Sequence, residues 1–266
     1  MEKSEIKPLV SIITVCYNAG AEIERTIKSV LSQKYENLEY IVIDGGSKDN
    51  TKDVIQHYQD RIDIFISEPD NGIYDAMNKG TKLSHGKWLN FMNAGDVFND
   101  DNVLDEIINN GPFDNNIKII YGNVLILYEG QKGIIKKPGY LCSDKIQFDL
   151  NHQSTLIEGD WMRQEGYDTS YKIAADAHFF NETAKCGFLF QYVPVTIAKY
   201  EASVGVSAVN QMRLFNEIMR IKNIKKGNLQ WVKGYLRACF FNFMHHIPYG
   251  IGEKMLALYI RKRVRG

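Results

Sequence analysis

Polar and acidic residues that suit phosphate or metal chemistry follow short apolar runs at several places in this chain. Tyr17 and Asn18 follow one run, Asp44 follows a second, the segment 68–72 (EPDNG) follows a third, and the segment 93–96 (NAGD) follows a fourth. Carboxylate and amide oxygens are good ligands for a hard divalent cation, and neighbouring glycines let backbone approach a ligand closely. Any one of these clusters could be an ordinary turn, but the four together favour a binding site.

The apolar runs before these clusters are typical of buried strands. Residues 9–15, 39–44, 63–67 and 87–92 are short and rich in β-branched or aromatic side chains. Amphipathic stretches separate them, one of which predicts a helix over 73–83. Strands that alternate with helices through short links predict an α/β fold with a mostly parallel central sheet. The carboxyl ends of parallel strands meet at one edge, so we expect the four clusters to line one pocket.

The composition is that of an ordinary folded protein, with 44% hydrophobic and 24% charged residues. The four cysteines are scattered without metal-ligand spacing, so we expect reduced thiols in a cytoplasmic protein. The first residues lack the order typical of a secretory signal, and no apolar stretch reaches the ~20 residues that a membrane-spanning helix needs.

Four ordered segments of the chain resemble the family 2 glycosyltransferases, which are inverting enzymes with the Rossmann-like GT-A fold. The segments are VSIITVCYNAG (10–20), IVIDGGSKDNT (41–51), SEPDNGIYDAMNKG (67–80) and WLNFMNAGD (88–96). HQS at 152–154 and IAADAHFF at 173–180 look like the acceptor-side segments of the same family. The resemblance implies a GT-A domain over 1–208, with a donor half (1–100), an acceptor half (101–208) and a helical extension (209–266).

The resemblance also implies the reaction, which is transfer of a sugar from a nucleoside-diphosphate sugar, a UDP-sugar by preference, to a hydroxyl of a glycan or lipid-linked saccharide. This would make the chain an enzyme of the hexosyltransferase class in the synthesis of bacterial cell-surface polysaccharide, lipopolysaccharide or O-antigen. Two alternatives remain open, a catalytically silent nucleotide-sugar-binding protein and a sugar nucleotidyltransferase. The second lacks support, because no glycine-rich loop with Arg and Lys follows the first strand.

Donor binding is expected from residues at the strand ends. Asp44 could accept from the imide N–H of uracil, Thr14 and Tyr17 offer a hydroxyl and a ring face, and Asp70 is a second candidate at the uracil edge. The other expected donor-binding residues are Asn18, Gly45, Ser47, Asn78, Lys79, Asn93, Ala94, Gly95 and His152. Lys79 could equally lie on a solvated helix face, and His152 could be a satisfied core histidine.

The segment 93–96 occupies the place of the family's acidic metal motif and departs from it, because Asp96 is its one carboxylate. We expect Asp96 to be the main protein ligand of Mn²⁺ or Mg²⁺ that bridges the diphosphate. With so few protein ligands, metal affinity without the nucleotide should be weak.

Inverting transfer needs a base for the proton of the acceptor hydroxyl. By resemblance that base is Asp176, with Asp168 and Glu165 as nearby rivals. An Asp early in a helix can also serve only as a partner of the helix dipole.

The last part of the chain is strongly basic. From residue 213 onward there are twelve Lys and Arg against Glu217 and Glu253, although the whole chain has zero net charge. Aromatic residues interleave with this charge, so the extension 209–266 is either a helical lid or a segment that binds anionic membrane. We expect peripheral association with the inner face of the cell membrane. Basic charge alone is unspecific, and we expect no nucleic acid partner.

Overall fold

The structure is a computed structural model that describes residues 7–127, 133–138, 150–201 and 210–245. The chain divides into two compact units. The first unit comprises residues 1–125 and 137–200, and the second comprises residues 126–136 and 201–266.

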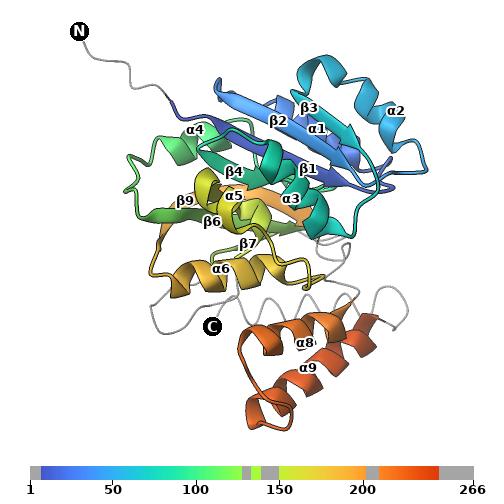
Figure 1. Cartoon of the computed structure of the whole chain (residues 1–266), viewed down its shortest axis with the longest axis vertical. Helices are drawn as coiled ribbons and strands as arrows, with labels where there is room; N and C mark the ends of the chain where they lie inside the picture. The colour runs from blue at the N-terminus through green and yellow to red at the C-terminus, as the bar shows by residue number, and fades with distance from the viewer. Residues whose placement is uncertain (1–6, 128–132, 139–149, 202–209, 246–266) are drawn as a thin grey trace. The chain divides into compact units, whose positions relative to one another are not determined.

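Four parallel strands form the first half of the sheet, in the order β3-β2-β1-β4 (Figure 1). They are β1 (Val10–Cys16), β2 (Leu38–Asp44), β3 (Ile64–Ser67) and β4 (Trp88–Phe91). β1 pairs in parallel with both β2 and β4 and is buried over its whole length, which explains its continuous apolar run. The α/β fold with parallel central strands that the sequence predicts is confirmed.

The helices between these strands cover both faces of the sheet. α1 (Ile23–Leu31), α2 (Thr51–Gln56) and the short η1 (Gln59–Arg61) link β1 to β2 and β2 to β3. α3 (Ile73–Leu83) links β3 to β4 and packs on β1 and β2. Right-handed crossovers place α3 on the face opposite α1, because the strand order reverses on returning from β3 to β4 (Figure 1). The reversal lies between β1 and β4, and in such sheets ligands bind at the carboxyl ends of the strands beside the reversal.

Close packing of α3 on the sheet depends on Gly80. A Cβ built at Gly80 would lie 2.5 Å from Cγ2 of Ile13 in β1, so only a glycine fits at this separation. α3 thereby carries the segment 67–72, which precedes it, to the carboxyl edge of the sheet.

Antiparallel pairings extend the sheet beyond β4, in the order β8-β6-β9-β5, with β7 paired to β6. These strands are β5 (Val97–Phe98), β6 (Ile117–Leu127), β7 (Ile134–Lys136), β8 (Thr155–Glu158) and β9 (Leu189–Glu201). The helices of this half are α4 (Val103–Ile108), η2 (His152–Ser154), α5 (Gly159–Glu165) and α6 (Ala175–Lys185).

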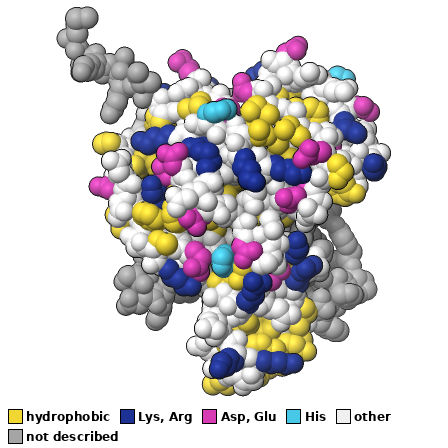
Figure 2. All heavy atoms as spheres, in the orientation of Figure 1, with side chains coloured by type: hydrophobic (Ala, Val, Ile, Leu, Met, Phe, Trp, Pro, Cys, Tyr) yellow, Lys and Arg dark blue, Asp and Glu magenta, His cyan; other side chains and the backbone are white. Residues whose placement is uncertain are grey.

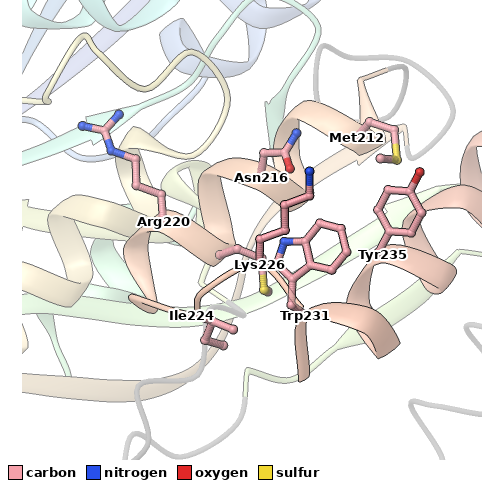
Figure 3. A pocket seen from close by; sticks show the side chains of 8 residues that line it. Met212, Asn216, Arg220, Ile224, Lys226, Trp231 and Tyr235 are labelled. Carbon is pink, nitrogen blue, oxygen red and sulfur yellow. The ribbon is translucent and has the colours of Figure 1, made fainter. Parts of the chain in front are cut away.

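The second unit contains the helices α8 (Gln211–Ile221) and α9 (Leu229–His245), which pack against each other. Phe215 of α8 packs against Trp231 and Tyr235 of α9, at ring-centroid distances of 5.5 and 6.1 Å. A groove of about 510 Å³ runs between them (Figure 3). None of the helices in the described ranges is both long enough and apolar enough to cross a bilayer.

Candidate active site

The carboxylate of Asp44 fixes the turn that follows β2. Asp44 is fully buried and accepts hydrogen bonds from the backbone N–H and hydroxyl of Ser47, and its Oδ2 accepts from the Ser67 hydroxyl at 2.6 Å. Gly46 has φ of +81°, which a side chain would disfavour. Asp44 therefore ties the ends of β2 and β3 together, and it has no exposed surface to offer a nucleobase.

Two other expected donor contacts also belong to the framework. Thr14 is fully buried, and its hydroxyl donates to the carbonyl of Met92 at 2.8 Å. The amide of Asn78 makes two bonds of 2.8 Å to the backbone of Tyr167, one to its carbonyl and one from its N–H. The side chains of Thr14, Asp44 and Asn78 thus bond within the protein, and their direct contact with the donor stays a prediction.

Asp70 lies where a side chain of residue 45 would be. A Cβ built at Gly45 would lie 2.2 Å from Oδ2 of Asp70, while Oδ1 of Asp70 accepts the N–H of Gly72 at 2.9 Å. Asp70 is partly exposed, unlike Asp44. The carboxylate over the end of β2 is thus supplied by the segment after β3, and Gly45 makes room for it.

The loop after β1 borders the same edge. The Tyr17 side chain is 61% exposed, and Asn18 adopts φ of +48° with its Oδ1 accepting the N–H of Lys48. The hydroxyl of Ser47 accepts the N–H of Asn18 at 2.8 Å, which joins this loop to the turn after β2. Lys79 pairs with Glu68 at 2.8 Å and also donates to the carbonyl of Pro69. Because its ring is exposed, Tyr17 remains a candidate for stacking on a ligand.

The segment 93–96 forms a turn that is clamped to α1. The hydroxyl of Thr26 accepts the N–H of Gly95 at 2.9 Å and donates to the carbonyl of Asp96 at 2.8 Å. Arg25 donates to the carbonyl of Gly95, and Ala94 donates its N–H to Val15 of β1. Gly95 has φ of +99°, so the turn favours glycine there. These bonds fix the backbone of the turn that carries Asp96, at the carboxyl ends of β1 and β4.

Burial raises the pKa of the Asp96 carboxyl to about 6, although the nearby His152 and Arg25 oppose the rise. A carboxylate in such a place is short of positive charge, and a cation would supply it. In the described ranges no three His, Cys, Asp or Glu side chains group as metal ligands. However, the buried Oδ1 of Asn93 has no hydrogen-bond partner. Asp96 and Asn93 thus fit a divalent ion that takes most of its oxygens from the ligand.

Asp176 lies in the first turn of α6 and receives hydrogen bonds from three sources. Its Oδ1 accepts the N–H of Ala177 at 2.8 Å and lies 3.1 Å from the hydroxyl of Tyr74 in α3. Its Oδ2 lies 3.1 Å from Nδ1 of His152 in η2. The carboxylate is therefore held in one orientation, with its side chain 17% exposed.

His152 joins Asp176 to the turn after β4. Its Nε2 lies 2.9 Å from Nδ2 of Asn93, so the imidazole contacts both candidate sites. Burial lowers the pKa of His152, but the hydrogen bond and charge of Asp176, with the charge of Asp96, outweigh it and raise this pKa above its usual value. Asn93, His152 and Asp176, which the sequence analysis assigns to one active site, thus lie within hydrogen-bonding distance along this chain of contacts.

Comparison with known proteins identifies the family of this chain. The family model for glycosyl transferase family 2 matches residues 11–147, about half of the chain. The chain belongs to glycosyl transferase family 2. An uncharacterised glycosyltransferase of Mycobacterium tuberculosis is 30% identical over 184 residues, which cover 66% of this chain and 69% of that protein. The protein is therefore a glycosyltransferase.

Solved structures show that the fold is GT-A. A mannosyltransferase from Pyrobaculum calidifontis, solved with GDP-Man and Mn²⁺, has a TM-score of 0.65 at 14% identity and covers 96% of this chain and 80% of its own. A fragment of S. aureus TarS, solved with UDP-GlcNAc, has a TM-score of 0.60 at 15% identity and covers 88% of this chain and 71% of its own.

Tyr74 belongs to the site and was not expected from the sequence. It lies in the matched segment 67–80, but nothing in the local pattern distinguishes it from a core aromatic residue. Only its contact with Asp176, 102 positions later in the chain, reveals its role. Burial and the negative charge of Asp176 raise the pKa of Tyr74, so its hydroxyl keeps its one hydrogen. That hydrogen is shared between the carbonyl of Ile173 at 2.7 Å and Oδ1 of Asp176 at 3.1 Å.

The raised pKa of Asp96 predicts a pH-dependent gain in stability for Asp96→Asn. The pKa of Asp96 is about 6 in the folded protein, against 3.8 for an ordinary aspartate, so the native state holds more protons between these pH values. Its stability therefore falls as pH rises through this window, by up to about 3 kcal/mol at 1.36 kcal/mol per unit. Asn carries no charge, so thermal unfolding without metal should show Asp96→Asn more stable than wild type at pH 7.5 and equal to it near pH 3.5. The exposed Asp53→Asn is the control, and a loss of stability in Asp96→Asn at pH 7.5 would contradict the account.

Proposed function

We propose that this glycosyltransferase transfers a sugar, with inversion, from a nucleoside-diphosphate sugar to an acceptor hydroxyl. The observation that carries the proposal is the pairing of Asp176, a held carboxylate, with the residue 93–96 turn through His152. One group can accept a proton and the other can meet a diphosphate, which are the two requirements of direct displacement. The ligands named for the two GT-A structures, GDP-Man and UDP-GlcNAc, support a nucleotide-sugar donor.

The proposed nucleotide subsite lies at the ends of β1 and β2. Asp70 is placed over Gly45 to accept from a base N–H, and the exposed ring of Tyr17 can stack on the base. Asn18 and Ser47 shape this edge by joining the two loops. An acceptor carboxylate matches the imide N–H of uracil, so we favour a UDP-sugar.

The proposed diphosphate subsite is the turn 93–96. Mn²⁺ or Mg²⁺, held by Asp96 with the amide oxygen of Asn93, would neutralise the charge that develops on the leaving nucleoside diphosphate. Gly95 and Ala94 leave space at this turn, since the nearest atom to a Cβ built on Gly95 is 3.5 Å away. The rise in the pKa of Asp96 agrees with a carboxylate that lacks its cation.

In the proposed step, Asp176 takes the proton of the acceptor hydroxyl as its oxygen attacks the anomeric carbon. The bond from that carbon to the diphosphate oxygen breaks on the opposite face, and the nucleoside diphosphate leaves with the electron pair. Tyr74 and His152 hold the carboxylate in place for this transfer. Asp168 is exposed and accepts the N–H of Ser170, so it is a weaker candidate for the base.

The base assignment predicts that Asp176→Asn lowers kcat for sugar transfer by about 10²- to 10⁴-fold, because an amide cannot take the proton. Asp96→Ala should lower activity and raise the Mn²⁺ concentration needed for half-maximal rate. The measurement is release of nucleoside diphosphate with a panel of nucleotide-sugars and acceptors. Asp168→Asn is the matched control and should stay within about threefold of wild type. Full activity of Asp176→Asn would remove Asp176 as the base.

The fit between Gly45 and Asp70 predicts that Gly45→Ala weakens UDP binding by about 10- to 100-fold, because the new methyl displaces a carboxylate hydrogen bond to the base. Calorimetric titration of wild type, Gly45→Ala, Asp70→Ala and the double variant measures the coupling. Gly45→Ala should cost little once Asp70 is already Ala. Additive losses would show that Gly45 acts on the nucleotide independently of Asp70.

We also propose that the acceptor is carried at an anionic membrane surface, which the basic unit formed by α8 and α9 contacts. Leu229, Val232 and Leu236 lie on one face of α9 and are 67, 39 and 63% exposed. Lys233 is exposed on the same helix, and apolar and basic side chains adjoin on the visible surface of these helices (Figure 2). Apolar side chains next to lysines are the pattern of interfacial helices. A lipid-linked saccharide in cell-surface polysaccharide synthesis is an acceptor of this kind.

Membrane contact predicts that Leu229→Glu with Leu236→Glu reduces flotation of the full-length protein with vesicles that contain anionic lipid. The change replaces apolar surface, which would be buried in the membrane, with negative charge that anionic lipid repels. Leu189→Glu is the control, since Leu189 is equally an exposed leucine, at 50%, but belongs to the first unit. Unchanged flotation of the double variant would contradict membrane contact through α9.

A further inference from the structure

One imidazole connects the two chemical groups of the site. His152 contacts Oδ2 of Asp176 through Nδ1 at 3.1 Å and Nδ2 of Asn93 through Nε2 at 2.9 Å. Its side chain is 18% exposed, and Asn93 is 8% exposed, so both contacts are sheltered from water. His152 comes from η2, Asn93 follows β4 and Asp176 lies in α6, so three separate elements meet at this ring.

The partners of the ring determine where its proton lies. The carboxylate of Asp176 only accepts hydrogen bonds, so Nδ1 of His152 carries a hydrogen. Nε2 lies 2.9 Å from Nδ2 of Asn93, an N–H group that can only donate, so Nε2 accepts from it. The nitrogen of the Asn93 amide therefore bonds to His152, and the amide oxygen Oδ1 takes no part in this contact.

That oxygen is the second observation. Oδ1 of Asn93 is buried and has no hydrogen-bond partner in the described part of the chain. A buried acceptor without a partner is unfavourable, and such an atom in a native site indicates a donor or cation that arrives with the ligand.

His152 also fixes the other partner. Oδ1 of Asp176 is held by Tyr74 and by the N–H of Ala177, whereas in the described ranges Oδ2 is bonded by His152. Without the imidazole the carboxylate would keep one anchored oxygen and lose the bond that sets its plane. Misplacement of a reacting group by about 1 Å can cost about 10²-fold in rate.

We propose that His152 is a positioning residue that sets the Asp176 carboxylate and the Asn93 amide together, so that the base and the diphosphate side of the site are aligned through one ring. This rests on the proposed function. His152 takes no proton from the acceptor in this account. It acts through its two neighbours, with Nδ1 serving the proton-transfer side and Nε2 serving the donor side.

Two substitutions separate the two nitrogens. In His152→Asn the side-chain amide nitrogen falls near the position of Nδ1, so the bond to Asp176 can remain while the contact with Asn93 is lost. In His152→Gln the amide falls near the position of Nε2, so the contact with Asn93 can remain while the bond to Asp176 is lost. A residue that merely fills space would respond to both changes in the same way.

The experiment measures kcat and the donor KM of the full-length enzyme with saturating acceptor and Mn²⁺. His152→Gln should lower kcat about 10- to 100-fold with the donor KM within about threefold of wild type. His152→Asn should keep kcat within about threefold and raise the donor KM about tenfold. Calorimetric titration of the nucleoside diphosphate gives a second readout, in which only His152→Asn should bind more weakly.

The control is a second histidine–carboxylate pair, in which Nδ1 of His85 lies 2.7 Å from Oε1 of Glu39. His85 precedes β4 and therefore lies at the opposite edge of the sheet from the site. His85→Asn and His85→Gln should leave kcat and KM unchanged, and thermal unfolding checks that all four variants are folded.

Equal losses in His152→Asn and His152→Gln, or no loss in either, would overturn the proposal while leaving the enzyme's function intact. If one of the two variants does not fold, the nucleotide titration and kinetics of the other variant still test the imidazole nitrogen whose contact that variant removes. Failure of the proposed function gives a different result, because wild type itself would then release no nucleoside diphosphate from any donor.

Discussion

The hydrogen bonds that Asp176 receives from Tyr74 and His152 are the contacts on which the site depends. Tyr74 belongs to α3, in the half of the sheet built from parallel strands, and Asp176 belongs to α6, in the half built from antiparallel strands. A carboxylate held by only one hydrogen bond could rotate and adopt several orientations. Because these donors come from separate elements and the site is sheltered from water, the carboxylate keeps one orientation. The same bonds fix the position of α3 relative to α6 at the proposed active site.

The order of the strands explains why the other groups converge there. β1 pairs with both β2 and β4, so the loops after these three strands leave the sheet side by side. The turn 93–96 is then fixed to α1 through Thr26, and the turn after β2 is fixed by Asp44 and Ser67. The framework side chains are therefore bonded within the protein, and the side chains that we propose to meet the ligand at this edge are those of Tyr17, Asp70, Asn93 and Asp96.

Much of this could be predicted from the sequence, because strands buried on both faces give continuous apolar runs and α3 gives a clear helical pattern, found at Ile73–Leu83 as expected. The short β8 (Thr155–Glu158) was not predicted. The sequence also could not separate Thr14 and Asp44, whose polar groups are satisfied inside the protein, from Asp70, which reaches the edge. That distinction depends on the space above Gly45, which only the packing of two distant segments reveals. Tyr74 was missed for the same reason.

The most direct test of the account is the anomeric configuration of the transferred sugar, measured by proton NMR on product formed from a donor of known configuration. A single held carboxylate on the acceptor side, with the leaving diphosphate on the opposite face, predicts that the product has the inverted configuration from the first turnover. Retention of configuration would contradict the account, because direct displacement with Asp176 as the base cannot produce it.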